Sequence, residues 1–297
     1  MKDLITDFFK TLNIETADSF DEILDNVSDA FGEEAVANIE NIVYSQPHEG
    51  QDAELFEYIN TTPALSVMVF GGVDGGFYRK LFRNIQKNRQ FLGKDILVLD
   101  GSCPIAGCFL GKMLPESHIT CACSAESFTS VGEALAEQLG LSNIEFTATD
   151  IRKLTGKYDT VLCSRVSEQF VGSAREDIDF DGSNHQIAGQ YERLYTEYAR
   201  RIKSLLNDGG SMISVDTSPY TMGIYGLYSA FARMNIAPDL GTYLRLIYIS
   251  LGEREAIPFV CCRMGTTDMT LMEQFFDEVF IRETEQDDSY YDNKMSR

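Results

Sequence analysis

The strongest chemical signal in the chain is a short apolar segment that ends in an acid and leads into small residues. The segment is Asp95–Asp100, and Gly101, Ser102, Cys103 and Gly107 follow it. An apolar run of this length indicates a parallel strand buried on both faces. Small residues in a tight turn let a ligand approach the backbone amides closely, and the acid can hold a cationic group.

The elements around this turn alternate between strands and helices. Further strands are expected at residues 118–123, 144–148, 158–163 and 211–215, with helices at 127–139 and 187–206. This alternation predicts an α/β fold with helices on both faces of a parallel sheet. Residues 244–251 and 257–264 then predict a β-hairpin that closes one edge of the sheet.

The chain divides into three predicted parts by its patterning. Residues 1–92 form an α-helical N-terminal region, residues 93–283 the Rossmann-like domain, and residues 284–297 a frayed acidic tail. Within the first part, a short helix is expected at 63–70 and a basic helix at 77–91. The glycine-rich run 71–76 is interpreted as a flexible turn between these two helices.

From Asp95 to Met264 the order of elements resembles the class I S-adenosylmethionine-dependent methyltransferase fold. The loop departs from that family's D-x-G-x-G-x-G pattern, because Ser102, Pro104 and Ala106 replace glycines. The resemblance implies that S-adenosylmethionine is the cofactor and that Asp150 bonds the adenine amino group. The cofactor-binding residues that it implies are Asp100, Gly101, Ser102, Cys103, Gly107, Cys123, Ser124, Asp150, Ile151 and Cys163.

The end of the second strand is the main departure from the family. Methyltransferases of this class usually have an acid there that grips the ribose hydroxyls, whereas this chain has Cys123 followed by Ser124. Glu126 lies three residues beyond Cys123 and could reach the ribose. The alternative is that Glu126 only stabilises the N-terminus of the helix that begins there.

A weaker resemblance is to nicotianamine synthase-like enzymes, which transfer the aminobutanoyl arm of the same cofactor. Gly101–Ile105 resembles their G-S-G-P-L loop, and Thr149–Ile151 resembles their T-D-I step.

Candidate catalytic residues follow the fourth strand, where a substrate would enter. Glu168 and His185 are the predicted catalytic residues, and Arg165 and Gln169 lie in the same region. Methyl transfer needs a base only if the nucleophile must lose a proton. The long polar segment 173–189 is either a lid over the site or a solvated insertion.

Charge and composition limit the partners of this 297-residue chain. Its net charge of −21 disfavours nucleic acid. No apolar run is long enough for a membrane span, and the N-terminus lacks a signal peptide, so a cytoplasmic location is expected. Seven cysteines and three histidines without paired metal-ligand spacing predict no metal site.

One stretch of this acidic chain is rich in basic residues. Its basic residues are Arg79, Lys80, Arg83, Lys87, Arg89 and Lys94. Either acidic helices pack near this basic helix, or it forms a patch for an anionic ligand.

The sequence therefore favours a methyltransferase acting on a small-molecule substrate. The alternatives are aminobutanoyl transfer and a non-catalytic protein with a methyltransferase-like fold. The N-terminal helices could cover the substrate pocket or form the interface of a homodimer.

Overall fold

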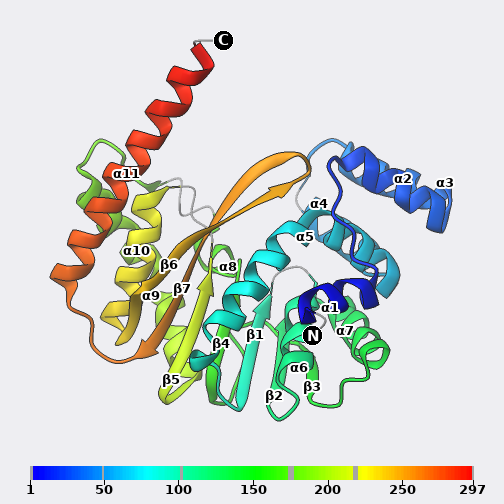
Figure 1. Cartoon of the computed structure of the whole chain (residues 1–297), viewed down its shortest axis with the longest axis horizontal. Coiled ribbons are helices and arrows are strands. Elements are labelled where there is room, and N and C mark those ends of the chain that lie inside the picture. Colours follow the sequence, from blue (N-terminus) through cyan, green and yellow to red (C-terminus); the bar gives the residue numbers. More distant parts are fainter. Residues whose placement is uncertain (1–2, 49, 101–102, 173–176, 217–219, 296–297) are drawn as a thin grey trace.

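The structure is a computed structural model that describes residues 3–295 except 49, 101–102, 173–176 and 217–219, and leaves aside the side chains of 168–169 and 283–295. Its centre is one seven-stranded sheet in the order β3-β2-β1-β4-β5-β7-β6 (Figure 1). The strands are β1 (Asp95–Asp100), β2 (His118–Cys123), β3 (Ile144–Ala148), β4 (Tyr158–Ser164), β5 (Leu206–Val215), β6 (Ile236–Ser250) and β7 (Glu253–Met264).

Helices pack on both faces of this sheet, as the sequence predicted. Before β1 lie α1 (Leu4–Leu12), α2 (Phe20–Phe31), α3 (Glu33–Val43), α4 (Gln51–Ile59), α5 (Pro63–Lys87) and the 3₁₀ helix η1 (Arg89–Phe91). The later helices are α6 (Ile105–Met113), α7 (Glu126–Leu139), α8 (Glu168–Val171), α9 (Asn184–Leu205), α10 (Thr221–Arg233) and α11 (Met269–Met295).

The alternation of side chains along β1 explains why both faces are covered. Ile96 and Val98 belong to a core shared with α1, α5, α6 and α7. Leu97 and Leu99 point to the other face, into a core shared with α9, α10 and α11. A strand buried in this way has apolar residues at successive positions, which is the pattern that predicted it.

The first five strands are parallel, and β7 pairs antiparallel with both β5 and β6. The predicted hairpin is confirmed, although it is longer than expected. β5 also begins earlier than predicted. Its pairing with β4 shifts from Leu206 opposite Tyr158 to Ser211 opposite Thr160, so residues 207–210 bulge from the strand.

The glycine-rich run 71–76 is not a turn, and this prediction was wrong. It lies inside α5, a single helix that crosses one face of the sheet (Figure 1). The glycines are used for close packing. A Cβ atom built on Gly71 would lie 3.0 Å from the Ile14 side chain, and one on Gly76 would lie 2.7 Å from the carbonyl oxygen of Ile249. Tertiary contacts thus override the low helix propensity of glycine.

The long helix α5 joins the N-terminal helical region to the sheet. Its residues Phe77, Leu81 and Ile85 are fully buried in the same core as Ile96 and Phe259. The helices α2, α3 and α4 form a separate apolar cluster with the first half of α5. Residues 1–92 are therefore continuous with the domain that follows them.

Candidate active site

The acid at the end of β1 lies beside the end of β4, under helix α5. Asp100 is 1% exposed and is paired with Ser164, the last residue of β4. The next residue, Arg165, has a φ of 57° and donates its backbone N–H to the Val215 carbonyl at 3.2 Å. A left-handed conformation is uncommon for a residue other than glycine, and here it turns the chain sharply after β4.

The Arg165 guanidinium forms a two-pronged ion pair with Asp74 of α5. Its Nη1 and Nη2 atoms donate to Oδ1 and Oδ2 of Asp74 at 3.0 and 2.8 Å. Burial disfavours the charged guanidinium, but the charge and hydrogen bonds of Asp74 outweigh this and raise the pKa of Arg165. The guanidinium carbon also lies 4.8 Å from the centroid of the Phe77 ring. This contact fixes α5 to the carboxyl edge of the sheet.

A buried tyrosine completes this cluster. Tyr78 is 0% exposed, and burial followed by the charges of Asp100 and Asp74 raises the pKa of its phenol. The phenol is therefore neutral at physiological pH. Two carboxylates, those of Asp74 and Asp100, therefore lie near the Arg165 guanidinium, and both contribute to the rise in its pKa.

Cys103 lies on the same side, in contact with the first half of α5. Its thiol shares a hydrogen bond of 3.4 Å with the Ser66 hydroxyl, which donates to Oδ1 of Asn60 at 2.7 Å. Burial raises the pKa of the Cys103 thiol to about 12. The thiol is a neutral polar group of the cluster and is not activated as a nucleophile. We name Ser66, Asp74, Tyr78, Asp100, Cys103 and Arg165 the polar cluster.

Two predicted loop residues, Gly101 and Ser102, lie outside the residues that the structure describes. Gly107 is within α6, and a Cβ atom built on it would lie 2.0 Å from the Cys121 sulfur of β2. Close packing of α6 against the sheet therefore accounts for this glycine. Its proposed contact with a cofactor stays a prediction.

The thiol at the end of β2 is affected by a carboxylate of α4. Cys123 is partly exposed, and its thiol pKa is raised by burial and then by charges that include Asp100 and Glu57 of α4. Glu57 is therefore the carboxylate of α4 to test at the strand end where the sequence lacks an acid. Ser124 and Glu126 are exposed at the start of α7.

The acid after β3 is already engaged by a local turn. Oδ1 of Asp150 accepts the backbone N–H of Arg152 at 2.7 Å, and its Oδ2 lies 3.4 Å from the guanidinium of the same residue. Ile151 is 4% exposed, and its carbonyl accepts a 2.6 Å bond from Arg201. Both residues lie at the carboxyl edge of the sheet, where the resemblance placed them.

The far side of β4 is held by a buried carboxylate that the sequence analysis did not identify. Asp216 accepts the backbone N–H groups of Val166 and Ser167, each at 2.9 Å, and the Tyr198 hydroxyl at 2.8 Å. Burial raises its pKa, and these bonds partly offset the effect. Cys163 is fully buried beside this carboxylate in the core under α9.

The two predicted catalytic residues both lie after β4, and the structure does not test their role. Glu168 begins α8, and its side chain is outside the described residues. His185 lies on the face covered by α9, α10 and α11. Its Nε2 atom is 3.0 Å from Asp277 and its Nδ1 atom is 3.7 Å from Glu273, both of α11. Catalysis by either residue stays a prediction.

The described part of the segment 173–189 folds back onto α9. The Asp179 N–H donates to the Gln190 side chain at 2.9 Å, and that side chain donates to the Asp179 carbonyl at 2.8 Å. Ile178 is 8% exposed and packs into the core under α9. These contacts hold the described part of the segment in place.

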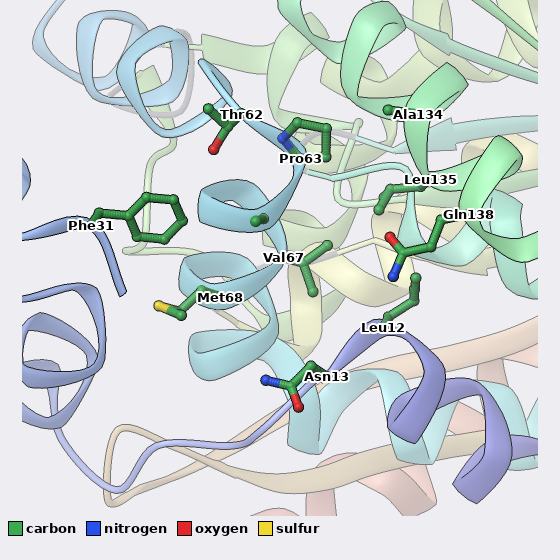
Figure 2. A pocket seen from close by; sticks show the side chains of 11 residues that line it. Leu12, Asn13, Phe31, Thr62, Pro63, Val67, Met68, Ala134, Leu135 and Gln138 are labelled. Carbon is green, nitrogen blue, oxygen red and sulfur yellow. The ribbon is translucent and has the colours of Figure 1, made fainter. Parts of the chain in front are cut away.

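A separate hollow of about 460 Å³ lies between α1, α5 and α7 (Figure 2). Leu12, Val67 and Leu135 contribute apolar surface, and Asn13 and Gln138 add amide groups. None of its lining residues is ionisable, so acid–base chemistry is better placed at the polar cluster.

Comparison with known proteins gives structural likenesses only. No family model matches the chain, and no curated protein matches its sequence. TrmN from Thermus thermophilus is 15% identical with a TM-score of 0.43, over 69% of this chain and 49% of that one. This chain therefore spans about half the length of TrmN.

Two further likenesses cover nearly all of the other protein. The N-methyltransferase NodS from Bradyrhizobium japonicum WM9 is 14% identical with a TM-score of 0.42, over 65% of this chain and 99% of that one. Magnesium protoporphyrin IX methyltransferase from Synechocystis PCC 6803, solved with S-adenosylmethionine bound, is 11% identical with a TM-score of 0.42, over 82% and 97%. The strand order of this chain, with its antiparallel β7, is itself that of the class I methyltransferase fold, so the fold predicted from the sequence is confirmed.

Proposed function

We propose that this protein binds S-adenosylmethionine and transfers its methyl group to a small molecule. The observation that carries the proposal is the buried Asp100 at the end of β1 in a methyltransferase sheet, beside the ion pair of Arg165 and Asp74. The ammonium and sulfonium groups of S-adenosylmethionine are cations, and a carboxylate at this strand end has the opposite charge.

The residues at the carboxyl edge fit the rest of this cofactor. Asp100 would hold the ammonium group, and Asp150 keeps carboxylate lone pairs with which it could accept the adenine amino group. Glu57 of α4 would take the place of the missing ribose acid after Cys123, because its charge already acts at that strand end. Glu126 is the competing candidate for this role.

The cofactor supplies a methyl group on a sulfonium, so the demands on the protein are position and exclusion of water. Helix α5 covers the edge of the sheet, and its residues Asp74 and Tyr78 are buried, as is Cys103. Arg165 holds α5 in place through Asp74. If the acceptor must lose a proton, Glu168 and His185 are the candidate bases.

A small-molecule acceptor is favoured over a nucleic acid by two features. The net charge of −21 repels a phosphate backbone, and the polar cluster is enclosed under α5. A homodimer through the N-terminal helices and a cytoplasmic location stay predictions.

Product analysis separates methyl transfer from the two alternatives. Methyl transfer breaks the bond between sulfur and the methyl carbon and leaves S-adenosylhomocysteine. Aminobutanoyl transfer breaks the bond between sulfur and the aminobutanoyl carbon and leaves methylthioadenosine. A non-catalytic protein would bind the cofactor and release neither product when it is incubated with candidate amines.

The binding test compares Asp100→Asn with Asp95→Asn, an exposed acid at the opposite end of the same strand. S-adenosylhomocysteine should raise the melting temperature of the unmodified protein, because a ligand bound only to the folded state stabilises it. By calorimetric titration, Asp100→Asn should weaken S-adenosylmethionine binding about tenfold or more and leave adenosine binding nearly unchanged. Asp95→Asn should affect neither ligand. Absence of binding by the unmodified protein at millimolar ligand would refute the proposal.

A further inference from the structure

A second hollow lies on the side of α5 that faces the β6–β7 hairpin. Its volume is about 380 Å³, and we name it the α5 groove. Helix α5 forms one wall, the hairpin forms another, and residues 16–18 before α2 form the third. In Figure 1 the hairpin reaches from the sheet toward the N-terminal helices. Residues far apart in the sequence therefore meet at this groove.

The charge of the groove is opposite to that of the whole chain. Four cations line it, Arg79, Lys80, Arg83 and Arg254, against one carboxylate, Asp18. The chain as a whole has 46 acidic residues and 25 basic ones. Positive charge is therefore concentrated at this groove in a chain that is negative as a whole.

Among the residues that the structure describes, no carboxylate forms an ion pair with any of these four cations. Helix α2 does pack on α5, but its acids do not pair with these side chains. Glu255 pairs with Tyr248 across the hairpin, and burial followed by the charges of Asp74 and Glu255 raises the pKa of the Tyr248 phenol.

Two of the cations also repel each other. Arg79 and Arg83 are one helical turn apart, and like charges at this spacing destabilise a helix. Burial lowers the pKa of Arg79, the charge of Arg83 lowers it further, and Asp3 partly opposes this change. The Arg79 guanidinium is held by the Phe9 ring, whose centroid is 4.0 Å from its central carbon. An anion between the two arginines would relieve their repulsion.

The hairpin wall supplies apolar surface beside the charge. Ile247 and Ile249 are 42% and 53% exposed, and Tyr248 lies between them. Large apolar side chains are less common on an exposed edge strand than charged ones. A ligand that fits this groove would combine an anionic group with an apolar or aromatic part.

We propose that the α5 groove binds a small molecule that carries a phosphate or diphosphate group. Arginine is suited to this because its planar guanidinium donates two parallel hydrogen bonds to phosphate oxygens, and three arginines line this groove. A volume of about 380 Å³ is within the usual range for small-molecule sites. The site is separate from the polar cluster, since no residue of that cluster lines the groove.

Inorganic pyrophosphate is the probe for the test, titrated calorimetrically at fixed ionic strength into the full chain without S-adenosylmethionine. The test variant is Arg83→Gln/Arg254→Gln, and the matched control is Lys87→Gln/Arg89→Gln, which removes two exposed cations outside the groove. The test variant should bind pyrophosphate about tenfold or more weakly, and the control should bind like the unmodified protein. Hydrogen exchange should slow in residues 76–83 and 247–255 when pyrophosphate binds.

Three outcomes would overturn the proposal. The first is no binding of pyrophosphate at millimolar concentration by the unmodified protein. The second is an equal loss in both double variants, which would show a diffuse effect of charge. The third is binding to vesicles that contain an anionic phospholipid without binding of soluble pyrophosphate, which would make the groove part of a membrane-facing surface. None of these results depends on whether the protein transfers methyl groups.

Discussion

Replacement of Gly76 by alanine tests whether α5 is one helix packed closely on β6. In an exposed helix, glycine to alanine is stabilising by about 1 kcal/mol, because alanine has the higher helix propensity. In α5, however, the new Cβ atom would lie 2.7 Å from the carbonyl oxygen of Ile249 and 3.5 Å from the Cβ of Tyr248. The first distance is too short for a carbon–oxygen contact, and the oxygen belongs to the backbone of a paired strand.

The magnitude follows from two opposing effects. Forcing one methyl group into a packed contact costs about 1–3 kcal/mol. The gain in helix propensity offsets about 1 kcal/mol of this. Gly76→Ala should therefore lower the free energy of unfolding by up to about 2 kcal/mol. Gly189 in α9 is the matched control, because a Cβ atom there would have no neighbour within 4 Å. Gly189→Ala should raise the free energy of unfolding by about 1 kcal/mol.

Urea denaturation of both variants and the unmodified protein, followed by circular dichroism, measures these differences. Opposite signs for the two alanine variants would support the packing of α5 on β6. If Gly76→Ala stabilises the protein as much as Gly189→Ala does, the close contact between α5 and β6 does not exist.

Three further predictions concern the site and the opposite edge of the sheet. Arg165→Met should lower the free energy of unfolding by about 3–5 kcal/mol, because it leaves the Asp74 carboxylate buried without its partner. In a double-mutant cycle measured by urea denaturation, adding Asp74→Leu should recover part of this loss. Purely additive losses would contradict the coupling of the two residues. Hydrogen bonds lower the pKa of Asp159, so its stabilising effect is present above about pH 4 and is lost as the pH falls through its folded pKa. Asp159→Asn should therefore cost about 1 kcal/mol at pH 7, and the difference in melting temperature from the unmodified protein should shrink at pH 2–3. Glu57→Ala should weaken adenosine binding about tenfold in calorimetry, whereas a loss seen only in Glu126→Ala would assign the ribose to α7.

The sheet could be predicted from the sequence because its strands follow from local patterns. Each parallel strand is a short apolar run between turn residues. Because these strands are buried on both faces, successive residues are apolar whichever helices pack against them. The bulge in β5 was not predictable in this way. Residues 207–210 contain Asn, Asp and two glycines, and only pairing with β4 shows that they remain part of the strand.

The polar cluster could be predicted only in part. Asp100 follows directly from the strand that it ends, whereas Asp74 lies in the run that was interpreted as a turn. The spacing of Asp74 and Tyr78, four residues apart, is the helical signal that could have placed them on one face. Glycine propensity concealed this signal, because propensity describes an isolated helix and the packing partners of α5 come from distant parts of the chain.

The distance along the chain between α5 and its partners has a consequence for synthesis. The Ser250 hydroxyl donates to the carbonyl oxygen of Val73 across 177 residues. At about 5–20 residues per second, a ribosome needs roughly 10–35 s to add that many residues. For this time the N-terminal half of the nascent chain has an apolar helix without the strand that covers it. Nascent chains that end before β6 should therefore associate with chaperones more strongly than chains extended through β7, which ribosome-bound chains of defined length can show.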